Sequence, residues 1–174
     1  MIDIHVLTHE GTRSDWLDEC LKSLQDEPCT VHVVDNAGRS VGEGRATGYA
    51  LGQHPYVGFV DSDDYVFPGA INAVLRGLAR HHAVCTLEIP TFNGRPIYQA
   101  PRGGHNMFAA RRHEITPLLP HVATIPWLCD KLVVAHLKPH QLNVVGYMWR
   151  IHDAQTHRRI DATMMQRERA RLPW

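Results

Sequence analysis

The sequence YVGFVDSDD, at residues 56–64, is an apolar run that ends abruptly in three carboxylates. Like charges this close raise one another's pKa, so the group needs a compensating cation or full exposure to solvent. In an open α/β sheet, ligands bind at the edge formed by the carboxyl ends of the strands. The stretch therefore predicts a strand that ends at a cation or ligand site. A polar turn, with Asp64 as a cap, is the structural alternative.

The chain has 174 residues, 44% of them hydrophobic, which is enough for one well-buried core. We therefore expect a single domain over residues 1–174. Its 18 Lys and Arg equal its 18 Asp and Glu, so no global field draws it to nucleic acid or anionic membranes. No apolar run approaches the roughly 20 residues that span a bilayer, and the first residues do not resemble a signal peptide. These features predict a soluble, cytoplasmic protein.

Hydrophobic periodicity alternates between strand and helix along the first half of the chain. Strands are expected at 2–7, 30–34 and 56–60, and helices after a Ser14 cap, at 45–53 and from Pro68. Residues 41–44 are expected to form a flexible link. The second half is less regular, with expected strands at 84–89, 107–110 and 142–149, a turn at 93–96 and a helix at 126–137. This order predicts an α/β fold with a mostly parallel central sheet and helices on both faces.

Three segments of the first half form a recognisable pattern: Val33-Val34-Asp35, Gly44-Arg45-Ala46-Thr47-Gly48, and Asp61-Ser62-Asp63-Asp64 followed by Pro68. In order and spacing they resemble the family 2 glycosyltransferases, which have the single-domain, Rossmann-like GT-A fold. Two later segments resemble that family more loosely. Cys129-Asp130 stands where the family has an acidic pair, and Trp149-Arg150-Ile151-His152 is similar to its Tyr-Arg-x-His segment.

The resemblance implies a functional division of the domain. Residues 1–68 would form the nucleotide-sugar-binding half, residues 84–156 the acceptor and catalytic half, and residues 157–174 a basic tail. The implied activity is metal-dependent, inverting transfer of a sugar from a nucleotide-diphosphate sugar, with uridine as the leading base, to an acceptor hydroxyl. The chain is unusually short for the family, which leaves the acceptor unidentified.

A nucleotide-diphosphate leaving group gains negative charge as the glycosidic bond breaks, and a divalent cation held by carboxylates stabilises that charge. By the resemblance, we expect Asp63 to bind the metal directly and Asp61 to bind it through water or to meet the ribose. Ser62, between them, belongs to the same nucleotide-sugar site. Manganese or magnesium suits such oxygen ligands. His152 can ligate the metal as a neutral imidazole or contact a phosphate, and an ordinary strand-end histidine is its alternative.

Further residues are expected on the nucleotide side of the site. Thr8 and Glu10 follow the first strand and can line the nucleotide cleft, although Glu10 can equally cap a helix. Asp35 can accept a hydrogen bond from the base, and its alternative role is to cap the turn that follows it. Arg45 can pair with the base or the diphosphate as a planar donor, or be a solvated helix charge. Arg150 can add positive charge near the diphosphate.

Inverting transfer needs a base that deprotonates the acceptor hydroxyl as it attacks. Asp130 is the candidate, because it combines a carboxylate with a helix start and stands at the family's expected place. A first-turn acid favoured by the helix dipole is the structural alternative. Glu88 and Glu114 are the next candidates for the base.

Functions of other classes remain open at this stage. A nucleotidyltransferase would use a similar acidic sheet edge, but it would carry a Gly-rich, basic loop where this chain has Thr8-His9-Glu10-Gly11-Thr12-Arg13. A non-catalytic nucleotide-sugar-binding module would keep the fold without needing both Asp61 and Asp63. A minority alternative is glycosylation of a nucleic-acid base, with the Arg-rich tail contacting phosphates.

Overall fold

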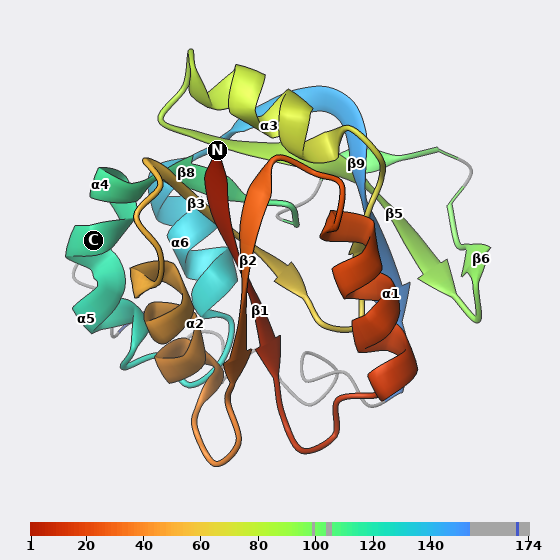
Figure 1. Ribbon diagram of the computed structural model, residues 1–174, viewed down its shortest axis with the longest axis horizontal. Coiled ribbons are helices and arrows are strands. Elements are labelled where there is room, and N and C mark those ends of the chain that lie inside the picture. Colours follow the sequence, from red (N-terminus) through yellow and green to blue (C-terminus); the bar gives the residue numbers. More distant parts are fainter. Residues whose placement is uncertain (99, 104–105, 154–169, 171–174) are drawn as a thin grey trace.

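The computed structural model describes residues 1–98, 100–103, 106–153 and 170. The expected basic tail at 157–174 lies outside the described residues, apart from Ala170. Figure 1 shows a central twisted sheet with helices packed on both of its faces. Within the described ranges, no helix is long and apolar enough to cross a membrane.

Strands and helices alternate in the first half of the chain, as predicted. The elements of this half are β1 (Ile2–Thr8), α1 (Ser14–Leu24), β2 (Cys29–Asp35), α2 (Val41–Ala50), β3 (Tyr56–Asp61), β4 (Tyr65–Val66) and α3 (Ala70–Leu78). The second half contains more short elements. They are β5 (Ala83–Phe92), β6 (Arg95–Pro96), β7 (Arg102–Gly103), β8 (Ala109–Arg111), α4 (Arg112–Ile115), the 3-10 turn η1 (Thr116–Leu118), α5 (Leu119–Val122), α6 (Cys129–Leu137) and β9 (His140–Ile151).

The strands form one sheet in the order β2-β1-β3-β8-β5-β9-β4, and β6 and β7 pair with β5 outside this path. The three longest ladders, β1 with β2, β1 with β3 and β5 with β9, are parallel. The antiparallel ladders are short, and β8 joins β3 to β5 through two of them. By ladder length the sheet is mostly parallel, as predicted, with antiparallel joins in its second half.

Strand β1 shows why the molecule has a core on each face of the sheet. Side chains alternate between the two faces of a strand, so Ile2, Ile4 and Val6 pack into one cluster with helices α1 and α3. The opposite face packs against α2, α5 and α6 through a second cluster that includes Tyr49 and Phe59. Both faces of the central strands are therefore buried, which accounts for the nearly continuous apolar sequence of β3. On β1 the second face carries the buried polar residues Asp3 and His5.

Helix α2 begins earlier than predicted, because residues 41–44 form its first turn and not a flexible link. Ser40 is the N-cap: its hydroxyl accepts a hydrogen bond from the Glu43 N–H at 3.2 Å, and the Glu43 carboxylate accepts one from the Ser40 N–H at 2.8 Å. This reciprocal pair is a capping box, which stabilises the helix start. A Cβ at Gly42 would collide with the carbonyl oxygen of Ile125, so glycine lets α2 pack closely there.

Three further predicted boundaries differ from the structure by a few residues. Ser14 is the first residue of α1 and not its N-cap. Helix α6 begins at Cys129 and not at Pro126, because Leu128 has a left-handed φ of 59° that interrupts the helical backbone. In the predicted turn at 93–96, only the first two residues turn the chain, and the last two return along β5 as strand β6.

Candidate active site

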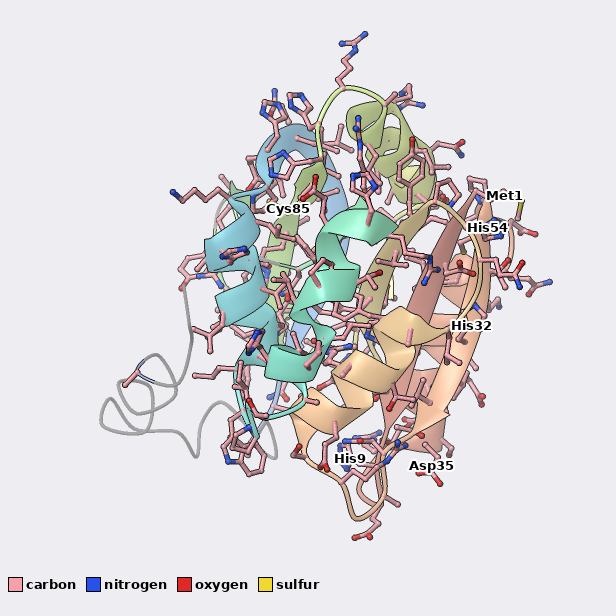
Figure 2. All side chains as sticks on the ribbon, turned by 90° about the vertical axis from the view of Figure 1, so that its left-hand side faces the viewer. Met1, His9, His32, Asp35, His54 and Cys85 are labelled. Carbon is pink, nitrogen blue, oxygen red and sulfur yellow. The ribbon has the colours of Figure 1, made fainter. Side chains whose placement is uncertain are left out.

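A cleft of about 230 Å³ lies at the carboxyl ends of β1 and β3. Figure 2 shows His9, a lining residue, at the same end of the molecule as Asp35, whereas Met1 and His54 lie at the opposite end. The lining comes from both halves of the chain: Leu7, Thr8, His9, Gly11, Thr12, Arg13, Trp16, Asn36, Val41, Arg45, Asp61, Ser62, Asp63, Asn106, Leu128, Asp130, Lys131, Trp149 and His152.

Most of the residues expected from the sequence meet at this cleft. Those that line it are Thr8, Arg45, Asp61, Ser62, Asp63, Asp130 and His152. Three expected residues, Glu10, Asp35 and Arg150, are not among the lining residues. The α/β topology brings the first group together because β1, β3 and β9 all direct their carboxyl ends to the same edge of the sheet.

Asp61 is paired with an arginine. The buried side chain of Arg45, on α2, forms an ion pair with Asp61 Oδ1, and its guanidinium lies 3.9 Å from the centre of the Phe59 ring. Burial lowers the pKa of Arg45, but the charges of Asp61 and Asp130 raise it more, so the net shift is upward. Arg45 therefore supplies a permanent positive charge at the floor of the cleft, and one carboxylate oxygen of Asp61 is engaged with it.

The second carboxylate, Asp63, is paired with a histidine from the end of β9. Asp63 Oδ2 and His152 Nε2 are 2.7 Å apart, and the His152 ring lies 4.8 Å from the ring of Trp16. Both side chains are only about one-quarter exposed, at 27% and 22%. At this separation the two side chains are hydrogen-bonded to each other. Carboxylate oxygen and neutral imidazole nitrogen are also ligand types for a divalent cation, which would have to replace this hydrogen bond.

The expected three-residue metal set is not assembled by the described residues, which contain no group of three or more His, Cys, Asp or Glu side chains placed to hold a metal ion. Arg45 occupies one oxygen of Asp61, and the other remains for the expected contact with the ribose or, through water, with the metal, which stays a prediction. Asp63 and His152 are a pair of ligand-type side chains that meet in the cleft, and their role toward a cation stays a prediction.

The third carboxylate of the run has a structural role. Asp64 is 1% exposed, and its two oxygens accept hydrogen bonds from the Tyr147 hydroxyl at 2.8 Å and from the Arg150 N–H at 2.6 Å. The Tyr147 hydroxyl in turn accepts a hydrogen bond from the Asp61 N–H at 3.1 Å. Burial, followed by the charges of Asp63 and Asp61, raises the pKa of Asp64 well above its ordinary value. Asp64 thus ties β9 to residues 61–64, called the acidic segment below, and is not a simple turn cap.

Arg150 supports the same segment from outside the cleft lining. Its Nη1 donates to the carbonyl oxygen of Asp63 at 2.9 Å, and its guanidinium forms an ion pair with Glu19 and lies 4.9 Å from the Trp16 ring. In this arrangement Arg150 holds the backbone of the acidic segment in place.

Asp35 takes the alternative role considered from the sequence. Its Oδ1 accepts a hydrogen bond from the Ala37 N–H at 3.0 Å, which caps the turn after β2, and the side chain is exposed. Thr8, opposite Asp35 in the β1–β2 ladder, lines the cleft and directs its hydroxyl to the Val34 carbonyl oxygen at 3.4 Å.

Asp130 lies in the first turn of α6 and lines the cleft, where its charge acts on Arg45 and Asp61. The preceding Cys129 is fully buried, and burial, followed by the charge of Asp130, raises the pKa of its thiol to about 12. The thiol is therefore neutral, so Asp130 is the ionisable residue of this position that faces the cleft.

Several lining residues were not identified from the sequence. Trp16 lies near the predicted start of α1, and Lys131 follows the predicted base Asp130. Their closeness in sequence to these predicted features could have indicated that they lie near the site. Trp149 belongs to the segment that resembles the family's Tyr-Arg-x-His motif, but its place in the cleft was not predicted. Asn106, between β7 and β8, carried no signal, because its place in the cleft depends on packing against β5.

Comparison with known proteins resolves the family. The model for glycosyl transferase family 2 matches residues 11–137 of this chain. The chain belongs to glycosyl transferase family 2. The match spans β2, α2 and β3, which carry Asp35, Arg45 and Asp61, and it continues through Asp130 in α6. A search of curated proteins finds no match.

Solved structures share the GT-A fold of this family 2 chain. Staphylococcus aureus TarS residues 1–349 in complex with UDP-GlcNAc is 16% identical, with a TM-score of 0.69 over 98% of this chain and 66% of that chain. TarS 1–349 in another crystal structure is 18% identical, with a TM-score of 0.63 over 86% of this chain and 60% of that chain. Mannosyl-3-phosphoglycerate synthase from Rubrobacter xylanophilus is 13% identical, with a TM-score of 0.57 over 98% and 73%. The chain thus spans less than two thirds of the length of the TarS structures.

Proposed function

We propose that this family 2 protein transfers a glycosyl group from a nucleoside-diphosphate sugar to an acceptor hydroxyl, with inversion at the anomeric carbon. The observation that supports this function best is the convergence of Asp63, His152 and Asp130 on one cleft from three separate elements. Asp63 and His152 would offer ligand atoms for a cation, and Asp130 would offer a carboxylate that can act as a base. Family membership favours this reaction over nucleotidyl transfer.

Asp63 and His152 are the residues that would hold a manganese or magnesium ion, whose charge would stabilise the departing diphosphate. Neighbouring residues of the chain hold Asp63 and His152 in position. Arg150 fixes the backbone carbonyl of Asp63, and Trp16 packs against the His152 ring, so both residues are supported by neighbouring side chains. Such support reduces the reorganisation needed when the diphosphate binds.

Asp61 has a different proposed role. Arg45 binds its Oδ1, which orients the carboxylate and leaves Oδ2 to accept a hydrogen bond from a ribose hydroxyl. Burial, with the charges of Asp63 and Asp130, raises the pKa of Asp61, and the positive charge of Arg45 opposes this rise. A carboxylate with one oxygen engaged in this way is a directed acceptor. Asp61 would then contribute to nucleoside binding rather than to the cation.

Asp130 is the proposed general base. Asp130 lies in the first turn of α6 and lines the same cleft as Asp61 and Asp63, which supports a role toward an acceptor hydroxyl that attacks the sugar. Removing the hydroxyl proton during the attack is the role that an inverting transfer requires. The acceptor itself would approach from the open side of the cleft.

The donor is best tested with uridine nucleotides first, because the TarS complex contains UDP-GlcNAc. We expect titration calorimetry to show that UDP and at least one UDP-hexose bind in the presence of Mn²⁺, and that a chelator weakens both. Binding of GDP and of GDP-mannose is measured in the same way to test guanosine as the alternative base. Absence of binding to every nucleotide and nucleotide sugar, with or without Mn²⁺, would contradict the proposed function.

A further inference from the structure

A buried polar chain connects strand β5 to the wall of the cleft. Glu88 is 1% exposed, and its Oε1 accepts a hydrogen bond from Arg102 Nε at 3.0 Å and forms an ion pair with Arg102 Nη2 at 2.9 Å. Its Oε2 accepts one from Asn106 Nδ2 at 2.8 Å. Asn106 is 2% exposed and lines the cleft. The buried carboxylate therefore links a surface arginine to an amide at the ligand site.

The fold explains why a charge is tolerated at this position. Glu88 lies opposite Arg102 in the β5–β7 ladder and opposite Tyr147 in the β5–β9 ladder, so it is enclosed on both sides. The Arg102 guanidinium lies 5.3 Å from the Tyr98 ring and 5.0 Å from the Trp149 ring. A buried carboxylate is stable only when paired and hydrogen-bonded, and this arrangement meets both conditions.

The carboxylate also decides which way the Asn106 amide faces. An ionised carboxylate only accepts hydrogen bonds, so Asn106 must direct its NH₂ group to Glu88. Its oxygen, Oδ1, is then the atom left for a ligand, and no described residue donates a hydrogen bond to it. Asn106 thus offers the cleft a hydrogen-bond acceptor of fixed orientation.

Asn106 lies on a different element from the residues assigned to the nucleotide and the cation, which come from β1, α2, the acidic segment and the end of β9. It shares the cleft wall with Trp149, whose ring adjoins Arg102. An apolar ring beside a directed acceptor is a suitable surface for a sugar, which presents C–H groups and hydroxyl donors together.

We propose that Asn106 Oδ1 accepts a hydrogen bond from a hydroxyl of the transferred sugar, and that Glu88 is the positioning residue that holds the amide in this orientation. This inference rests on the proposed function, since it names the group that binds the glycosyl part of the donor. It also assigns Glu88 a role other than that of a catalytic base, because both of its oxygens are occupied.

The test compares each diphosphate with its own sugar conjugate, by calorimetry with Mn²⁺ on the full chain. The probes are UDP with UDP-glucose, UDP-galactose and UDP-GlcNAc, and GDP with GDP-mannose. We expect Asn106→Ala to weaken the conjugate that the wild type binds most tightly by about fivefold to tenfold, the contribution of one hydrogen bond. The affinity for the free diphosphate should stay within about twofold of wild type. Asn143→Ala, an exposed change on β9, is the matched control.

Glu88→Gln tests the positioning role. Glutamine can satisfy Arg102 with its oxygen, but its NH₂ group then faces Asn106, so the asparagine amide must turn over and present NH₂ to the cleft. We expect a selective loss for the conjugate that is smaller than that of Asn106→Ala, because a rotating hydroxyl can still accept from the turned amide. If Glu88 acts through Asn106, adding Glu88→Gln to Asn106→Ala causes no further selective loss.

The outcomes separate this inference from the proposed function. Equal losses for diphosphate and conjugate, no loss for either in Asn106→Ala, or additive effects in the double variant would overturn the sugar-binding role. A wild-type protein that binds no diphosphate and no conjugate would overturn the proposed function and this inference with it.

Discussion

Asp63 Oδ2 lies 2.7 Å from His152 Nε2, although 89 residues separate the two in the sequence. The contact joins the acidic segment to the residue just after β9.

If Asp63 and His152 hold the cation, replacing either residue removes one of two protein ligands. We expect Asp63→Ala and His152→Ala each to weaken Mn²⁺-dependent UDP binding by at least about tenfold, measured by calorimetry. Asp26→Ala, an exposed change on the same chain, should have no effect. Wild-type affinity in both variants would exclude the pair as the cation site.

Replacement of the proposed base should separate binding from turnover. Asp130→Asn keeps the size of the side chain but cannot take up the acceptor proton, so we expect the transfer rate to fall by about 10²–10⁴-fold. Donor affinity should stay near that of the wild type. Turnover is measured with a donor that binds and a panel of hydroxyl acceptors, with Glu114→Gln as the control. Full activity of Asp130→Asn, together with loss in Glu114→Gln, would transfer the role to Glu114.

Asp64 predicts a specific dependence of stability on pH. In the folded state the pKa of Asp64 is raised, first by burial and then by the charges of Asp63 and Asp61. In the unfolded state its pKa is the ordinary value of about 4. Between these two values the folded state holds more protons, so the free energy of unfolding decreases as pH rises above about 4. Asp64→Asn removes this titration. We expect urea unfolding of that variant to show a flatter pH dependence than wild type.

The exposed variant Asp26→Asn is the control for Asp64 and should keep the wild-type profile. Asp64→Ala, which leaves the Arg150 N–H and the Tyr147 hydroxyl without their acceptor, should lower stability at every pH by about 1–3 kcal/mol. A wild-type pH profile in Asp64→Asn would contradict the raised pKa.

The start of α2 offers a test of local stability. Ser40→Ala removes the hydroxyl that accepts from Glu43, and we expect it to lower the free energy of unfolding by about 1 kcal/mol. Ser14→Ala is the matched control, because Ser14 begins α1 without capping it and is exposed. Equal effects of the two substitutions in urea unfolding would show that the capping box contributes nothing.

The sequence allowed prediction of the features that depend on local pattern. The apolar run into Asp61 and Asp63 predicted both a strand and the edge where the cleft lies. The α/β order followed from the alternation of strand and helix periods. The capping box at Ser40 was also readable from the spacing to Glu43, but the glycines around Arg45 suggested a flexible link instead.

Other features depend on contacts between distant residues, and sequence pattern does not report these. Arg45 was expected to pair with the base or the diphosphate, and that role stays a prediction, but the sequence did not show that Arg45 also pairs with Asp61 and packs on the Phe59 ring. Asp64 belongs to an acidic run, yet only the folded β9 shows that it faces Tyr147 and not the cleft. The roles of the site residues, including that of the cation, stay predictions until the variants are measured.

The position of β9 has a consequence for how the chain acquires its site. The β5–β9 ladder joins Val84 to His140 and Phe92 to Ile151, and it is this ladder that delivers Tyr147 to Asp64 and His152 to Asp63. Long-range parallel pairing of this kind forms slowly, because the chain loses loop-closure entropy before the stabilising contacts are made. During synthesis, the first half of the protein therefore leaves the ribosome with its acidic segment complete but without a partner strand. We expect the cleft to be among the last parts of the molecule to assemble, and a chain ending before Tyr147 to carry the family's motif without its binding site.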